Sequence, residues 1–161
     1  MKMEWQSSSI VLQRDLPLKV RQVYTWCITT DRKFLIVSKD NKTWQLPGGK
    51  PKAGESFAET AERELFEETG VADNDLSSYV LFGYYRVSAN SAEEFLQVRM
   101  YNKLSQSSVD LWPNVHQEDQ VQNDDDKIID VQTVSLTEAE VLIPWLLSSG
   151  EYKEIRDLNL L

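Results

Sequence analysis

The sequence predicts an α/β fold in which helices cover both faces of a mixed β-sheet, an α/β/α sandwich. Strand-like segments precede and follow one capped helix near the middle of the chain, and a second helical segment lies near its end. The 161 residues can bury one sizeable core. No repeat or shift in composition marks a boundary, so we expect a single domain over residues 1–161.

The first predicted elements form a β-hairpin. Residues 23–29 are rich in β-branched and aromatic side chains, and residues 33–38 continue with the apolar run FLIV. Asp31 and Arg32 lie between them and suit a turn. A short strand over residues 44–46 is expected to follow.

A glycine-rich loop and a helix come next. The Pro-Gly-Gly run at residues 47–49 ends regular structure, and the loop extends to Glu55. Ser56 with Glu59 three residues later is a capping box, which predicts a helix start, and Gly70 supplies a stop. We therefore expect a helix between Ser56 and Gly70.

The second half returns to strands. Residues 79–85 and 95–104 have strand-like composition, and the second segment alternates apolar and polar residues. A polar, acidic stretch over residues 117–127 precedes a further predicted strand over residues 128–135.

A final helix is predicted after this strand. Thr137 and Glu140 have capping-box spacing and would open a helix that runs through residues 141–147. Pro144 should kink this helix or cut it short.

Composition narrows the class of function. The formal charge is −9, from 26 acidic and 17 basic side chains. This field would repel DNA or RNA, whereas a small phosphorylated ligand could bind through a divalent cation. The single cysteine, Cys27, excludes an intramolecular disulfide. No apolar run approaches the ~18 residues of a membrane span, and the N-terminus lacks an apolar signal segment, so we expect a cytoplasmic protein without nucleic-acid or membrane partners.

Three glutamates on the central helix indicate a metal site. At about 100° per residue, Glu64, Glu67 and Glu68 fall within an arc of roughly 100° on one edge of the helix. Like charges at this spacing destabilise a helix and call for a counter-charge. Mg²⁺ prefers oxygen ligands and shares its remaining positions with substrate phosphates. The bare backbone of Gly48 would let its carbonyl approach such an ion.

The same stretch, residues 48–71, resembles the box of the Nudix hydrolase family, G-x5-E-x7-R-E-U-x-E-E-x-G-U with U aliphatic. Every specified position is matched by this sequence: Gly49, Glu55, Arg63, Glu64, Leu65, Glu67, Glu68, Gly70 and Val71. The resemblance implies a loop–helix–loop metal site on an α/β/α sandwich. It also implies Mg²⁺-dependent hydrolysis of a pyrophosphate bond, with Mn²⁺ as a possible substitute.

The resemblance also assigns roles to individual residues. Glu67 and Glu68 look like Mg²⁺ ligands, Glu64 looks like a ligand or the general base, and the Gly48 carbonyl looks like a further ligand. In the same way, Glu55 resembles a residue that supports the site through water. Arg63 resembles one that orients the glutamates by charge-assisted hydrogen bonds.

Two further sets of side chains stay open at this point. In this family the base can instead come from a later loop, where this chain offers Asp124, Asp125 and Asp126; an acidic surface loop is the alternative reading. Tyr24, Trp26 and Trp44 lie on or near strands that lead to the metal loop. Each could stack on a nucleobase or pack in the core.

The substrate is less well defined. The segments after the box resemble the layout of the branch that hydrolyses ADP-ribose and nucleotide sugars. That branch usually has a proline about fifteen residues after the box, where this chain has Arg86 and Val87. Alternatives are pyrophosphohydrolysis of nucleoside triphosphates, including oxidised ones, and a non-catalytic module that senses a nucleotide. The expected partner is a small nucleotide, bound by a monomer or a homodimer.

Overall fold

A computed structural model describes residues 1–7, 16–72, 75–90, 93–112, 115 and 127–161. Within these residues one sheet contains eight strands: β1 (Lys2–Ser7), β2 (Val20–Ile28), β3 (Phe34–Ser38), β4 (Trp44–Gln45), β5 (Gly48–Gly49), β6 (Val80–Asn90), β7 (Glu93–Lys103) and β8 (Asp130–Val134). The main order is β1-β6-β7-β2-β3-β4, while β5 pairs with β2 and β8 pairs with β3. The β2–β7 pair is parallel and the other pairs are antiparallel, so the predicted mixed sheet is confirmed.

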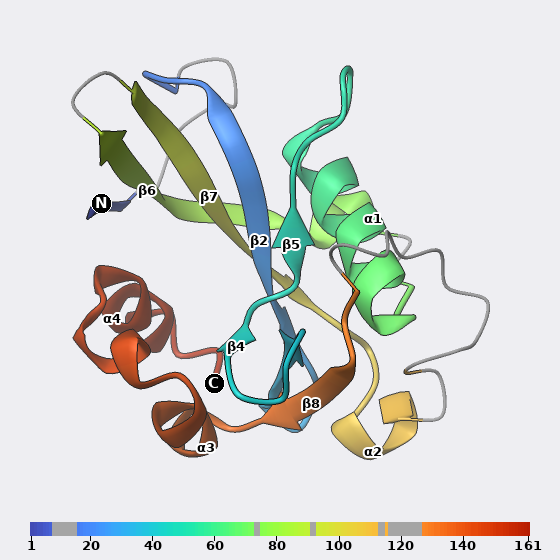
Figure 1. Ribbon diagram of the computed structural model, residues 1–161. Helices are drawn as coiled ribbons and strands as arrows, with labels where there is room; N and C mark the ends of the chain where they lie inside the picture. Colours follow the sequence, from blue (N-terminus) through green and yellow to red (C-terminus); the bar gives the residue numbers. More distant parts are fainter. Residues whose placement is uncertain (8–15, 73–74, 91–92, 113–114, 116–126) are drawn as a thin grey trace.

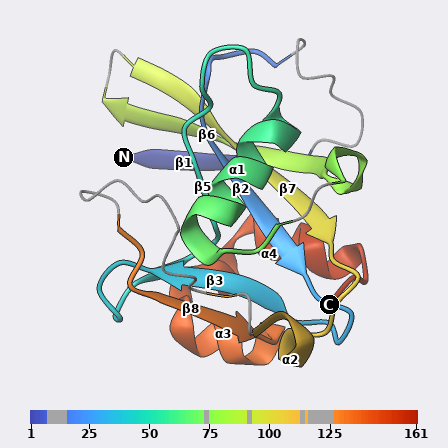
Figure 2. The same ribbon diagram turned by 90° about the vertical axis from the view of Figure 1, so that its right-hand side faces the viewer.

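Helices cover both sides of this sheet. The long helix α1 (Phe57–Thr69) lies on one side, and the C-terminal helices lie on the other (Figures 1 and 2). The C-terminal group consists of α3 (Leu136–Leu142), the 3-10 helix η5 (Pro144–Ser148) and α4 (Gly150–Asp157). Two short helices, η2 (Leu76–Ser78) and α2 (Ser108–Leu111), lie in connections. The predicted α/β/α architecture is confirmed.

Strand β2 contributes to the core on both faces of the sheet. Val23 and Cys27 join the apolar clusters packed with α1, whereas Trp26 and Ile28 join the cluster formed with the C-terminal helices. This division follows from the alternation of side chains along a strand. Because both faces are covered, β2 is a rigid central support for the loop that pairs with it.

The helix boundaries agree with the sequence at one site and differ at another. The capping box of α1 at Ser56 and its stop at Gly70 are confirmed. The predicted capping box at Thr137 is wrong, because Ser135 caps α3 by accepting from the Glu138 backbone N–H. Both serine and threonine can cap, and the strand β8 ends directly before Ser135, which sets the earlier start. As expected, Pro144 ends the α-helix, and a 3-10 helix follows.

Several elements of the structure were not predicted from the sequence, namely β1, the two-residue β5, α2, η2 and α4. Strand β1 is largely exposed at a sheet edge, so it carries no alternation of buried and exposed residues. Among the described residues, no helix combines the length and the apolar composition needed to cross a membrane.

Candidate active site

The site is built on two glycines that bring strand β5 against β2 and α1. Gly48 pairs with Tyr24, and Gly49 pairs with Val23. A Cβ atom on Gly48 would lie 2.2 Å from the Val23 carbonyl oxygen, and one on Gly49 would lie 2.4 Å from Oε1 of Glu64. Side chains at these positions would therefore displace either the β2 backbone or the glutamate that faces the loop.

Helix α1 presents its three glutamates to this loop. Glu64, Glu67 and Glu68 line one cavity together with both glycines of β5, and its volume is about 760 Å³. Glu68 is the most enclosed of the three, and its Oε1 accepts a hydrogen bond from the Gly48 N–H at 2.7 Å. The three glutamates and the glycine turn therefore line the same cavity.

Arg63 connects the carboxylates within the cavity. Its Nη1 group donates to Oε1 of Glu64 at 2.8 Å and to Oε2 of Glu67 at 3.2 Å. Its Nη2 group also donates to the Lys50 carbonyl at 2.9 Å, which ties the loop to the helix. One guanidinium therefore fixes the orientation of two glutamates and the position of the loop.

Glu55 forms the other half of this network. It accepts from Arg63 Nε at 2.7 Å and from Nη2 at 3.0 Å, the forked geometry of a strong arginine–carboxylate pair. The Lys52 N–H and the Thr60 hydroxyl also donate to it. The Arg63 hydrogen bond is the main reason why the pKa of Glu55 falls from 4.5 to about 2. Glu55 thus lies behind the glutamates and holds Arg63 in place.

Two glutamates of the cavity, Glu64 and Glu68, have pKa values that are shifted in the opposite direction from that of Glu55. Burial raises the pKa of Glu68 from 4.5 to about 8, although the Gly48 N–H opposes the shift. Burial also raises the pKa of Glu64, with Arg63 acting in the opposite direction. Both carboxyl groups are therefore poorly compensated when charged, which is the condition that a bound cation would relieve.

The donor set fits a hard divalent cation. In the described part of the chain, no three acidic, histidine or cysteine side chains are placed so that they could hold a metal ion as they stand. Arg63 and the Gly48 N–H, however, each engage one oxygen of a glutamate, so every carboxylate keeps a second oxygen. Carboxylate and carbonyl oxygens are the ligands that Mg²⁺ prefers. The glycines leave space directly beside Glu64, as a Cβ there would fill it.

The structure separates the three aromatic candidates. Tyr24 lines the glutamate cavity. Trp26 is 0% exposed and packs on Phe34 with ring centroids 4.6 Å apart, and Trp44 also belongs to this core. These two tryptophans are enclosed by the sheet and the C-terminal helices, so they are not available to stack on a ligand. Asp124, Asp125 and Asp126 lie outside the described residues.

A buried pair, Arg99 and Glu151, was missed by the sequence reasoning. Arg99 Nε donates to Oε1 of Glu151 at 2.8 Å, and the two side chains are 6% and 0% exposed. The alternation in β7 placed Arg99 on the polar side of the strand. In the structure, the C-terminal helices cover that side. The signal that could have indicated the burial of Arg99 was the predicted helix near the end of the chain, because it implies a second helical layer over the sheet.

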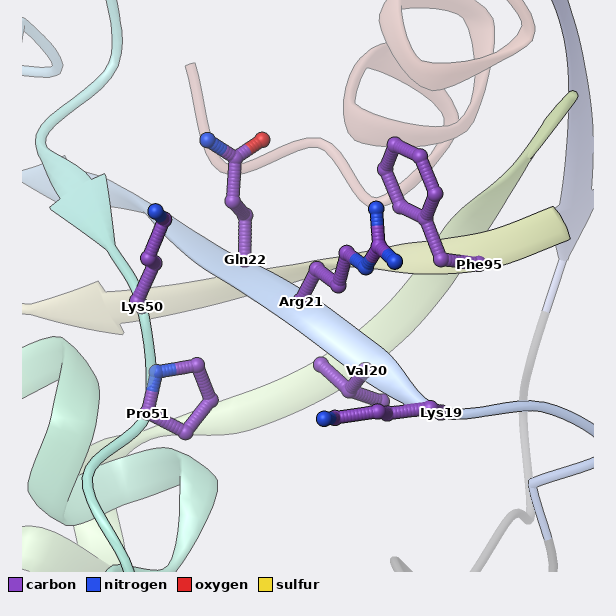
Figure 3. Close-up of a pocket in the computed structure, with 7 residues that line it drawn as sticks. All are labelled: Lys19, Val20, Arg21, Gln22, Lys50, Pro51 and Phe95. Atoms are coloured by element: carbon purple, nitrogen blue, oxygen red, sulfur yellow. The ribbon is translucent and has the colours of Figure 1, made fainter. Parts of the chain in front are cut away.

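A second neighbouring cavity is basic. Lys19, Arg21 and Lys50 line it together with Phe95 and Pro51, and its volume is about 450 Å³ (Figure 3). Arg21 lies over the Phe95 ring at 4.6 Å and is paired with Glu93. Because Lys50 and Pro51 also line the glutamate cavity, the two spaces adjoin.

Comparisons with known proteins agree with this geometry. The profile of the NUDIX domain matches residues 20–156. A segment of 43 residues is 54% identical to mouse (Mus musculus) nucleoside diphosphate-linked moiety X motif 6; it covers 25% of this chain and 14% of that protein. The chain therefore spans only a small part of the length of this relative.

Solved structures show the same fold. A NUDIX hydrolase from Nitrosomonas europaea aligns with a TM-score of 0.60 and 19% identity over 88% of each chain. The Bacillus subtilis pyrophosphohydrolase BsRppH gives 0.57 and 18% over 81% of this chain and 70% of that one. The NUDIX domain of Shewanella oneidensis NrtR, solved with ADP ribose, gives 0.56 and 17% over 93% and 90%.

Proposed function

Because this chain belongs to the NUDIX domain family, we propose that it is a Mg²⁺-dependent hydrolase that cleaves a pyrophosphate bond in a nucleoside diphosphate linked to another group. The observation that supports this proposal is the cavity in which Glu64, Glu67 and Glu68 face the glycine turn of β5. Substrates of this kind carry the adjacent phosphates that a carboxylate-bound cation would neutralise.

Each residue of the cavity has a proposed role. Glu64, Glu67, Glu68 and the Gly48 carbonyl would hold the metal, which would polarise phosphate oxygens and lower the pKa of a bound water. Arg63 keeps two of the glutamates oriented, and Glu55 keeps Arg63 oriented. In this proposal, these two residues orient the carboxylates for the incoming metal and substrate.

Glu64 is the proposed general base. It lines the cavity beside Glu67 and Glu68, where a carboxylate can accept a proton from a neighbouring water. It also lies beside Gly49, where no side chain separates it from the loop. The alternative is that Asp124, Asp125 or Asp126 supplies the base. A large fall in kcat in the Asp→Asn variant at one of these positions, with kcat little changed in Glu64→Gln, would identify it.

We propose ADP-ribose or a nucleotide sugar as the substrate class. The glutamate cavity adjoins the basic cavity of Lys19, Arg21 and Lys50 on one side and shares Tyr24 with an aromatic cavity on another. Such a layout suits a diphosphate flanked by two different groups. The fold also accommodates this ligand class elsewhere, since the NrtR domain was solved with ADP ribose.

The test is product formation from a substrate panel. Purified protein with Mg²⁺ is incubated with ADP-ribose, nucleotide sugars, dinucleoside polyphosphates and nucleoside triphosphates, and the products are separated by ion-exchange chromatography. We expect a nucleoside monophosphate from the diphosphate-linked compounds. Inorganic pyrophosphate from triphosphates alone would indicate a triphosphate pyrophosphohydrolase instead. Tight binding without turnover would indicate a nucleotide sensor.

A further inference from the structure

A third cavity, the aromatic cavity, adjoins the glutamate cavity and is lined by aromatic, apolar and polar side chains. Its volume is about 470 Å³, and its walls include Tyr24, Gln45, Leu46, Tyr85, Arg99 and Trp145. Tyr24 and Gln45 also line the glutamate cavity. A ligand whose diphosphate lies at the glutamates can therefore place an attached ring in the aromatic cavity.

Arg99 is held between two aromatic rings in this cavity. Its guanidinium carbon lies 4.6 Å from the centroid of Tyr24 and 4.9 Å from that of Tyr85. Glu151 holds it from behind through Nε, and the same carboxylate oxygen accepts from Trp26 Nε1 at 2.8 Å. The side chain is thus fixed in position without any ligand.

The ion pair leaves polar atoms without partners. Among the described residues, Arg99 Nη1 and Glu151 Oε2 are buried side-chain atoms with no hydrogen-bond partner. Arginine–carboxylate pairs frequently form two parallel hydrogen bonds, and that geometry would have satisfied both atoms. Here the guanidinium keeps a buried, unused donor in a side chain that lines a cavity. Such an unsatisfied group in a folded protein calls for a specific explanation.

We propose that Arg99 is a specificity-determining residue that reads an exocyclic carbonyl oxygen on the substrate's base, so that uridine or guanosine diphosphate derivatives are preferred over adenosine ones. The inference rests on the proposed function and narrows its substrate class to nucleotide sugars of uridine or guanosine, so that ADP-ribose is not the preferred member of that class. The base packs against the walls of the cavity beside Arg99, and Arg99 donates to its carbonyl oxygen. The cavity then supplies the ring contacts, and the base supplies the acceptor that Arg99 Nη1 lacks.

The chemistry of the bases distinguishes them at this donor. Uracil has two carbonyl oxygens, and guanine has O6 beside N7, so each presents strong acceptors to a guanidinium. Adenine has no exocyclic carbonyl, and on the edges that carry N1 and N7 its amino group would turn N–H donors toward a fixed cation. Leaving a donor next to an unpaired buried donor is strongly disfavoured, which is how a polar site rejects an analogue.

The experiment compares substrates that differ only in the base. Steady-state hydrolysis of UDP-glucose, GDP-glucose and ADP-glucose is measured with Mg²⁺. We expect kcat/KM for the uridine or guanosine compound to exceed that for the adenosine compound by at least about fivefold, the lower end of one bidentate base contact. Equal kcat/KM for all three, or a preference for ADP-glucose, would overturn the inference.

Variants of Arg99 test whether this side chain causes the preference for uridine or guanosine compounds. The Arg99→Lys variant keeps the charge beside Glu151 but loses the planar donor array, so we expect the preference to fall through KM while kcat stays close to its original value. Arg86→Lys on the exposed face of β6 is the matched control and should retain the preference. If Arg99→Lys does not fold, the paired variant Arg99→Leu/Glu151→Leu removes the buried charges together. An unchanged preference in a folded Arg99 variant would contradict the assignment.

Binding separates this inference from the proposed activity. Calorimetry with UMP, GMP and AMP in a chelating buffer requires neither metal nor hydrolysis. Tighter binding of UMP or GMP that is lost in Arg99→Lys would support base reading even if no substrate were hydrolysed. Absent hydrolysis of the whole substrate panel would refute only the proposed enzymatic activity.

Discussion

Arg63 explains how acidic side chains can share one cavity before any cation binds. It contacts Glu55, Glu64 and Glu67, so one positive charge offsets several negative ones. Each of these pairs is at most about one-third exposed, where charge-assisted hydrogen bonds are stronger than at the surface. Glu68 has no contact of this kind in the network and instead accepts from the Gly48 backbone. A bound metal would therefore stabilise the charged form of Glu68 more than that of the other glutamates.

The Glu68→Gln variant should therefore separate activity from folding. We expect hydrolysis to fall by at least about a hundredfold, since even supporting residues of metal sites change activity by up to that factor. The thermal midpoint should be retained, because the amide has nearly the same shape and loses a poorly compensated charge. Glu62→Gln on the same helix is the matched control, because Glu62 is not among the residues that line the cavity. Near-normal rates in Glu68→Gln would count against the metal site.

The Glu55–Arg63 pair predicts a loss of stability in acid. Since the pKa of Glu55 is about 2 in the folded state, its contribution is fully present above the ordinary pKa of 4.5. It is lost as pH falls from 4.5 through 2, and amounts to at most about 3 kcal/mol. Urea unfolding of the wild type and Glu55→Gln between pH 2 and pH 6 measures it. The difference between the two should shrink toward low pH, and a constant difference would contradict the assignment.

At the scale of elements, helix α1 was predictable because its signals are local. Ser56, Glu59 and Gly70 specify its ends within a few residues of sequence, and all three act as expected. Strand β1 and helix α4 were not predicted. The strand is exposed and shows no alternation, and α4 is short and polar apart from the side chains that it buries. Their positions depend on the surfaces against which they pack.

The N-cap of α1 gives the prediction at this scale. Ser56→Ala removes the acceptor for the Glu59 N–H and one half of the capping box, so the free energy of unfolding should fall by about 1 kcal/mol. Chemical denaturation measures the change. Ser105→Ala, at an exposed position between β7 and α2, is the control and should change stability by less than about 0.5 kcal/mol. Equal effects of the two substitutions would show that the cap contributes nothing.

At the scale of the whole molecule, the sheet brings distant parts of the chain to one place. The glutamates of α1 and the glycines of β5 lie about twenty positions apart and share a motif, so the sequence alone predicted that they meet. Arg99 and Glu151 are 52 positions apart and share no motif. Their contact depends on the C-terminal helices covering the sheet, which local patterns do not encode. The sequence therefore indicated the proposed catalytic cavity but not the adjoining aromatic one.

The central claim is that the three glutamates and the Gly48 carbonyl hold a divalent cation beside a diphosphate. A crystal grown with Mn²⁺ and a non-hydrolysable diphosphate analogue tests it most directly, through the anomalous signal of the metal. We predict a peak within about 2.0–2.4 Å of oxygens from Glu64, Glu67 or Glu68, with the analogue's phosphates on its open side. Anomalous peaks elsewhere, with these glutamates still bound to Arg63 and to the Gly48 N–H, would contradict the claim.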